Sequence, residues 1–233
     1  PAGLIQKDEG DFFVSCYDTN KIIQISENGN TLGEIVKTDA GKFFTGPNDF
    51  AKNSNGEIFF SASGIFDEKQ KPSGKIYRIK KNNTVKDISP NEPLSYPNGI
   101  AFSTDEKKIF VNEHLKNRIV TMNLLSSGML SEPKQFIDLK NFSPKTKSLK
   151  TGPDGLKLGP ISKNLYVCHY GGSQILIFTQ EGNFIKKIPM PMPFVTNLTF
   201  IENSEDEMFV TAESNANSEN FQYSGKVFRI NLN

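Results

Sequence analysis

"YPNGIAFSTDEKKIFVNEH", residues 96–114, places a Pro and a Gly on either side of Asn98. Residues 100–102 form a run typical of a β-strand, and a charged turn separates them from a second such run at 109–111. Proline restricts its own φ angle and the residue before it, whereas glycine permits a sharp turn. The stretch therefore predicts a β-hairpin that presents the Asn98 side chain where its first strand begins.

Five copies of this construction follow one another along the chain. Each consists of an opening residue, a first strand, a polar turn, a second strand that ends in small or polar residues, and a third strand. The residue just before each opening residue marks the start of its copy. These residues are Pro1, Pro47, Pro97, Pro153 and Val195, and they lie 46, 50, 56 and 42 residues apart. Repeats of this length indicate a β-propeller, because stacked blades bury faces that a single hairpin leaves exposed.

The repeats predict one all-β domain over residues 1–233, with units that start near residues 1, 46, 96, 152 and 195. Hydrophobic residues make up 36% of the chain, enough for a buried core. The net charge of +1, from 27 basic and 26 acidic residues, gives no indication of a nucleic-acid or membrane partner. The chain has no run of about 18 apolar residues, so no membrane span is expected.

The two cysteines, Cys16 and Cys168, form neither a disulfide framework nor the spacing of a thiolate metal site. The chain begins Pro1-Ala2, without an initiator Met and without a signal-peptide pattern. We therefore expect a processed or truncated N-terminus, which leaves a cytoplasmic and a secreted location both open. The sequence gives no indication of the oligomeric state.

The opening residues are the candidates for chemistry. In the usual propeller order the first strand of each blade is innermost, so its opening residue points to the mouth of the central channel. The five opening residues are Ala2, Asn48, Asn98, Asp154 and Thr196. Two amide oxygens and one carboxylate are hard donors that suit Ca²⁺, Mg²⁺ or Mn²⁺. The alternative is that Asn and Asp are simply favourable turn residues.

The second strand of each repeat returns to the same face, so its last residues are expected around the channel mouth. The two histidines, His114 and His169, both lie at such strand ends, and Tyr170 follows His169. Either histidine can move protons or contact a substrate; the alternative is a histidine that only hydrogen-bonds at a strand end. The loops at 64–74 and 140–152 are either plain connectors or the rim of a binding face.

The segments "GPNDF", "YPNGIAFSTDEKKIFVNEH", "GPDGLKLG", "NLYVCHYGGSQILIFTQEG" and "VTNLTF" occur in this order over essentially the whole chain. Together they resemble the senescence marker protein, gluconolactonase and luciferin-regenerating enzyme family. The resemblance implies a six-bladed propeller with one divalent metal ion on its axis, Ca²⁺ first, with Mg²⁺, Mn²⁺ and Zn²⁺ as alternatives. It also implies hydrolysis of a small-molecule lactone or ester.

The same resemblance implies roles for individual residues. Asn98 and Asp154 are similar to metal ligands, and Asn48 to a residue that contacts substrate or completes the metal's ligands. Asp154 is also the family's candidate for positioning or deprotonating the attacking water. We expect His114, His169 and Tyr170 around them to contact the substrate. A metal ion that polarises a carbonyl beside a carboxylate that accepts a proton is consistent with these residue types.

The chain departs from the family pattern in its first repeat. The family carries a metal-ligating Glu in a Glu-Gly-Pro motif, which is absent here, and the first repeat offers Ala2 at the opening position. Five repeats stand where six blades are implied. We expect either that an N-terminal blade is missing from this sequence or that the propeller closes with five blades.

Two alternatives to a hydrolase follow from this departure. One is a non-catalytic propeller that binds proteins or other ligands, since residues 1–25 also resemble the repeats of propellers named for their Asn-His-Leu motif. The near-zero net charge argues against RNA as such a ligand. The other is a propeller that binds Ca²⁺ or a small ligand for storage or signalling. Metal binding without turnover separates it from the hydrolase.

Overall fold

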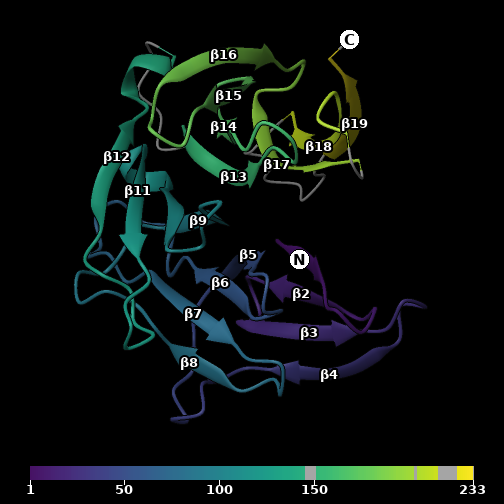
Figure 1. Ribbon diagram of the computed structural model, residues 1–233, viewed down its shortest axis with the longest axis vertical. Coiled ribbons are helices and arrows are strands. Elements are labelled where there is room, and N and C mark those ends of the chain that lie inside the picture. Colours follow the sequence, from purple (N-terminus) through teal and green to yellow (C-terminus); the bar gives the residue numbers. More distant parts are fainter. Residues whose placement is uncertain (145–150, 202–203, 215–224, 233) are drawn as a thin grey trace. The chain divides into compact units, whose positions relative to one another are not determined.

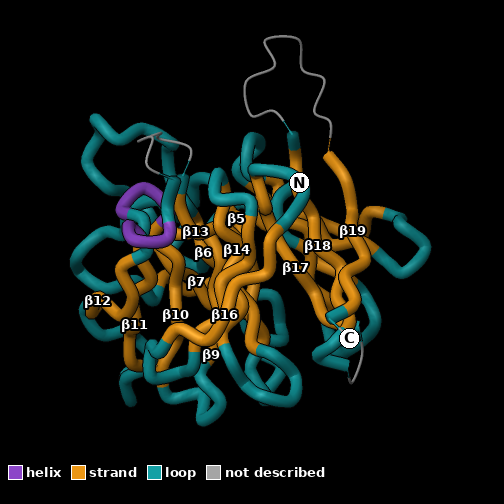
Figure 2. Tube along the Cα trace, turned by 90° about the horizontal axis from the view of Figure 1, so that it is seen from above, coloured by secondary structure: helices purple, strands orange, loops and turns teal. Residues whose placement is uncertain are grey.

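The computed structural model describes the chain except for residues 145–150, 202–203, 215–224 and 233. Strands dominate the described residues (Figure 2), which otherwise contain two short 3₁₀ helices, η1 (His114–Lys116) and η2 (Lys140–Phe142). In the described part of the chain no helix is long and apolar enough to cross a membrane. The chain divides into two compact units, and the first consists of Pro1–Phe110 and Thr121–Lys134. The second consists of Val111–Val120 and Gln135–Asn233.

Two four-stranded antiparallel sheets lie wholly in the first unit, and each joins strands in chain order (Figure 1). One is formed by β1 (Leu4–Gln6), β2 (Phe12–Cys16), β3 (Lys21–Ile25) and β4 (Thr31–Ile35). The other is formed by β5 (Pro47–Lys52), β6 (Ile58–Ala62), β7 (Lys75–Ile79) and β8 (Val85–Asp87). These two sheets are the first two predicted repeats, with a fourth strand added to each.

A third four-stranded sheet contains the quoted hairpin, and the division between the two units passes through its strands. Its strands are β9 (Pro97–Phe102), β10 (Lys108–Glu113), β11 (Arg118–Asn123) and β12 (Lys134–Asp138). β9 and β10 span the two strand-like runs predicted at 100–102 and 109–111. Both strands also extend beyond those runs, so that Asn98 lies inside β9 and Asn112 and Glu113 inside β10.

The remaining strands belong to the second unit. The fourth repeat is formed by β13 (Gly152–Leu158), β14 (Leu165–Tyr170), β15 (Gln174–Phe178) and β16 (Phe184–Pro189). The fifth is formed by β17 (Phe194–Phe200), β18 (Glu207–Glu213) and β19 (Gly225–Asn231). A single residue pair, Tyr170 with Phe194, joins β14 to β17 and links the two groups of strands into one sheet.

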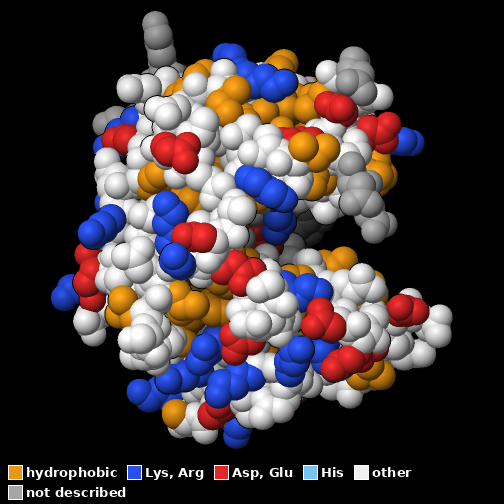
Figure 3. All heavy atoms as spheres, viewed as in Figure 1, with side chains coloured by type: hydrophobic (Ala, Val, Ile, Leu, Met, Phe, Trp, Pro, Cys, Tyr) orange, Lys and Arg blue, Asp and Glu red, His pale blue; other side chains and the backbone are white. Residues whose placement is uncertain are grey.

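The second strands β6, β10 and β14 are buried almost throughout, whereas β2 and β18 bury alternate residues. In β6 all five residues are buried, and Phe60 at its centre lies among the rings of Phe44, Phe50 and Tyr77. In the second unit the corresponding cluster gathers around Cys168, Ile175 and Val210. Basic and acidic side chains are mixed over the face shown in Figure 3, as the balanced charge predicts.

Four of the five opening residues do not lie in a turn before the strand, because β5, β9, β13 and β17 already include them, whereas Ala2 precedes β1. The ladder between β5 and β6 shifts register between Pro47 and Phe50. The ladders at β13 and β17 shift at the corresponding places, between Pro153 and Leu156 and between Val195 and Asn197. A β-bulge inserts an extra residue and re-aims a side chain. The predicted sharp turn is therefore a bulge at the start of each of these strands.

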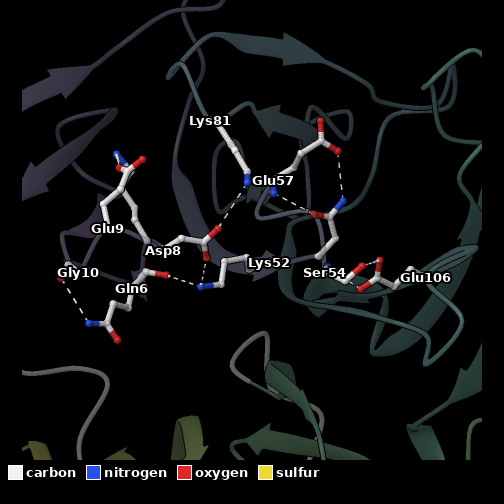
Figure 4. A network of polar contacts seen from close by, with 11 residues as sticks. Gln6, Asp8, Glu9, Gly10, Lys52, Ser54, Glu57, Lys81 and Glu106 are labelled. Atoms are coloured by element: carbon white, nitrogen blue, oxygen red, sulfur yellow. Dashed lines mark hydrogen bonds and ion pairs between the residues drawn. The ribbon is translucent and has the colours of Figure 1, made fainter.

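At the end of the first strands that lies away from the opening residues, carboxylates form hydrogen bonds and ion pairs between neighbouring turns. In the first unit Glu106 accepts hydrogen bonds from the backbone N–H (2.7 Å) and hydroxyl (2.8 Å) of Ser54. Asp8 pairs with Lys52 at 3.0 Å and Lys81 at 3.9 Å in the same network (Figure 4). These contacts stabilise the end of each sheet that lies away from the opening residues.

Candidate functional site

Asn48, in the bulge of β5, is half-buried and held at its side chain and its backbone. Its Nδ2 donates a hydrogen bond to Ser63 Oγ at 3.0 Å. Its carbonyl oxygen accepts a hydrogen bond from the Ser15 hydroxyl on the preceding sheet. The side-chain nitrogen is therefore engaged by protein, and Oδ1 is the atom that can bind a cation or a substrate.

Asn98, in β9, lies in the same unit and is 6% exposed. The carbonyl oxygens of Asn98 and of Pro97 before it each accept a hydrogen bond from a serine hydroxyl of the preceding repeat. Ser61 Oγ donates to Asn98 O at 2.6 Å, and Ser63 Oγ donates to Pro97 O at 2.6 Å. The backbone that carries Asn98 is thus fixed from both ends.

Asp154 opens β13 in the second unit and is half-buried. Asn112 Nδ2 donates to Asp154 O at 2.6 Å and also reaches Gly155 O at 3.4 Å. Asn48 and Asn98 belong to one unit and Asp154 to the other. Their predicted convergence on one axis stays a prediction.

One contact type recurs at all three candidate ligands, and sequence analysis missed it. A polar side chain in the second strand of the preceding sheet donates to the carbonyl oxygen of the opening residue. Its three donors are Ser15, Ser61 and Asn112. A signal for it was present, since each donor is a polar residue at the same register in an otherwise apolar strand. A buried polar group in such a place needs a hydrogen-bond partner.

His114 directly follows β10, the second strand of its repeat, and is buried. Its Nδ1 lies 3.3 Å from the carbonyl oxygen of Pro153. A carbonyl oxygen only accepts, so Nδ1 carries a proton, and in the neutral ring Nε2 carries the lone pair. The ring packs edge-to-face on Tyr170 at 5.6 Å, and the Tyr170 hydroxyl donates to Glu213 Oε1 at 2.7 Å. His114, Tyr170 and Glu213 thus form one contact chain in the second unit.

His169 is fully buried and has the opposite tautomer. Gln174 Nε2 lies 3.1 Å from its Nδ1 and 2.8 Å from the carbonyl oxygen of Phe142. The amide nitrogen is a donor, so His169 Nδ1 accepts and Nε2 carries the proton. Burial, and then the nearby charge of His114, lower the pKa of His169 to about 4. His169 is therefore neutral at pH 7 and cannot take part as a cation there.

Acidification is expected to destabilise the fold through His169. The unfolded state binds a proton near the ordinary pKa of 6.5, whereas the folded state resists protonation down to about 4. Falling pH therefore favours the unfolded state. At about 1.4 kcal/mol per pH unit, the free energy of unfolding should lose about 2 kcal/mol from this group between pH 7 and pH 5.

Urea denaturation at both pH values measures this loss in the wild type and in His169→Gln. The variant has no titrating ring, so its free energy of unfolding should fall by about 2 kcal/mol less over the same range. Equal pH dependence in the two proteins would show that His169 is not held neutral by the fold.

Aromatic side chains lie beside the opening residues of the first unit. Phe66, in the predicted rim loop 64–74, is exposed and packs edge-to-face on Tyr96 at 4.9 Å. Tyr96 has a φ of 57°, in the left-handed region that bulky residues rarely adopt. Residues with such strained backbone angles cluster at functional sites. Tyr96 lies two residues before Asn98. Part of the other predicted loop, at 145–150, lies outside the described residues.

The donor set can be compared with the implied cation. Across the residues that the structure describes, no three His, Cys, Asp or Glu side chains gather as metal ligands. The predicted set instead combines two amides with one carboxylate. The Asn48 amide fits a hard cation, because its nitrogen is engaged by Ser63 and its oxygen is the remaining donor. Of the three candidates, only Asp154 adds negative charge.

Comparison with known proteins shows which family this chain belongs to. The sequence profile of the SMP-30/Gluconolactonase/LRE-like region matches residues 1–214. The lactonase drp35 of Staphylococcus aureus (strain USA300) is 30% identical to the chain over 199 residues, which cover 82% of this chain and 57% of the relative. The lactonase drp35 of Staphylococcus saprophyticus matches to the same extent. The chain thus spans less than two thirds of the length of these curated relatives.

Solved structures agree on the fold. A luciferin-regenerating enzyme is similar with a TM-score of 0.76 at 20% identity, over 99% of this chain and 77% of that one. A gluconolactonase from Xanthomonas campestris is similar with a TM-score of 0.71 at 19% identity, over 90% and 68%. A calcium-binding regucalcin from Agrobacterium tumefaciens reaches 0.69 at 18% identity, over 97% and 74%. These likenesses confirm the predicted all-β propeller.

Proposed function

Because the chain belongs to the SMP-30/gluconolactonase/LRE-like family, we propose that it is a divalent-metal-dependent hydrolase of lactones. One observation in the structure carries the proposal furthest. The three opening residues with an amide or carboxylate side chain, Asn48, Asn98 and Asp154, all have their backbone carbonyls held by a polar side chain of the preceding sheet. Such support is what a preorganised ligand set requires.

The residues of the proposed site have different roles in the reaction. A hard divalent cation, Ca²⁺ first, supplies polarisation of the lactone carbonyl when it is bound. Asn48 offers Oδ1 and so binds without adding charge. Asp154 is the carboxylate that can accept the proton of the attacking water. His114 can accept a hydrogen bond or a proton through Nε2, because Pro153 O holds the proton on Nδ1.

The roles of the other predicted substrate contacts follow from their burial. Tyr170 is half-buried and holds Glu213 through its hydroxyl, so it can shape the pocket wall beside His114. His169 is fully buried and neutral, which favours a supporting role over direct contact with substrate. His114 is also buried, but its ring packs against the half-buried Tyr170, so of the two histidines it is the stronger candidate to lie at the wall of the site.

A panel of five- and six-membered lactones tests the proposal, with proton release recorded at constant pH. We expect hydrolysis that chelation abolishes and that one of Ca²⁺, Mg²⁺, Mn²⁺ or Zn²⁺ restores. Acyclic esters with the same acyl group serve as the comparison and should react more slowly. Activity that survives full chelation would overturn the metal-dependent mechanism.

A second candidate is a non-catalytic, ligand-binding propeller. The observation in its favour is Ala2, which stands at the opening position of the first repeat and offers no donor side chain. With Asp154 as the single carboxylate among the opening residues, cation affinity is lower than in a site with two. A bound cation with no turnover on any lactone in the panel would favour this candidate.

A further inference from the structure

Ser63 links the two candidate ligands of the first unit. It directly follows β6, is 1% exposed, and its backbone N–H donates to Gly46 O at 2.7 Å. Its hydroxyl makes two hydrogen bonds. It accepts one from Asn48 Nδ2 at 3.0 Å and donates one to Pro97 O at 2.6 Å. One buried hydroxyl thus connects the side chain of Asn48 to the peptide that precedes Asn98.

The two contacts determine which way each group points. Pro97 O is a carbonyl and only accepts, so the single hydroxyl proton of Ser63 is committed to it. Toward Asn48 the hydroxyl can then only accept, which requires the amide nitrogen of Asn48 on that side. A rotated amide would bring Oδ1 against the lone pairs of Ser63 Oγ. The network therefore holds Nδ2 toward Ser63 and turns Oδ1 away from it.

We propose that Ser63 is a positioning residue for the cation site, acting by orienting the Asn48 amide so that Oδ1 is presented as the ligand atom. This inference rests on the proposed function, because it assumes that Asn48 binds the cation. Without the Ser63 hydroxyl, the amide can rotate and present a donor N–H, which repels a cation.

Cation affinity in a double-mutant cycle tests this role directly. Calorimetric titration of Ca²⁺ into chelated protein compares the wild type with Ser63→Ala, Asn48→Ala and the double variant. Removing a residue that supports a metal ligand typically weakens affinity by about 10- to 100-fold, and we expect this for Ser63→Ala. In the Asn48→Ala background the same change should cost much less than in the wild type, because Ser63 then has no amide to orient and only its bond to Pro97 O, beside Asn98, is lost.

Two further variants separate positioning from general stability. Ser63→Thr keeps the hydroxyl and should bind Ca²⁺ with nearly the wild-type affinity. Ser103→Ala removes another buried serine hydroxyl, which bonds Asp105 at 2.6 Å at the opposite end of the strands. It should lower the melting temperature without changing Ca²⁺ affinity. Equal affinity in Ser63→Ala and the wild type, or independent costs in the double variant, would overturn the role of Ser63.

A second readout needs no cation. In the metal-free protein, the Asn48 side-chain amide can be assigned in a ¹⁵N-correlated NMR spectrum by its loss in Asn48→Ala. One of its protons should be shifted downfield by the bond to Ser63 in the wild type and in Ser103→Ala, but not in Ser63→Ala. An unchanged resonance in Ser63→Ala would contradict the proposed orientation. A wild type that shows the shift but binds none of the four cations would instead refute the proposed function, and with it the positioning role.

Discussion

Replacing Asp154 with Asn is expected to reduce lactone hydrolysis by about 100- to 10,000-fold, the range over which a positioned proton acceptor contributes. Among the opening residues Asp154 is the single carboxylate, so it combines negative charge with basicity. Asn keeps the size and an oxygen donor but cannot accept the proton. The bond from Asn112 goes to the backbone oxygen of Asp154, so the substitution leaves it in place.

Initial rates at saturating cation, together with melting temperatures, measure this effect. Asp138→Asn is the matched control, because Asp138 is an exposed carboxylate of the same unit that pairs with Lys140 at 3.5 Å. It should retain wild-type activity. If Asp154→Asn keeps more than about a tenth of the wild-type rate, Asp154 is not the proton acceptor.

Replacing Phe60 with Ala is expected to lower the free energy of unfolding by about 3–5 kcal/mol, as for other large aromatic residues in a core. Phe60 is fully buried in β6. Its ring stacks on Tyr77 at 5.0 Å and packs edge-to-face on Phe44 at 5.2 Å. Truncation removes these contacts and leaves a cavity that its rigid neighbours fill only in part.

Urea denaturation measures the loss, with Phe43→Ala as the control. Phe43 precedes Phe44 in the chain but is 75% exposed, so its truncation should change the free energy of unfolding by less than about 0.5 kcal/mol. Similar values for the two variants would mean that the β5–β8 sheet does not pack around Phe60 as described.

The repeating strands were predictable because the pattern is local. Alternating apolar residues, polar turns and the Pro-Asn-Gly sequence at 97–99 all act within a few residues, and β9 and β10 appear where they predict them. The bulges were not predicted. They depend on how a first strand pairs with the second, and the residues around Asn48 and Asp154 are compatible with either a turn or a bulge.

The supporting residues of the site were less accessible to sequence reasoning. Ser61 and Ser63 are ordinary strand residues until the next sheet places Asn98 O and Pro97 O against their hydroxyls. The two histidines occupy similar strand ends, yet neighbours from other strands give them opposite tautomers. Contacts between sheets decide the roles of the serines and the tautomer of His114, whereas the tautomer of His169 depends on Gln174 in the neighbouring strand of its own repeat.

The proposed function requires that a bound cation makes the protein able to hydrolyse lactones. The most direct test titrates chelated wild-type protein with Ca²⁺ and records bound cation and hydrolysis rate in one sample. The hydrolysis rate should rise in proportion to bound cation, and both should saturate at one ion per chain. Turnover in the chelated protein, or a saturated site that hydrolyses no lactone, contradicts the proposed function.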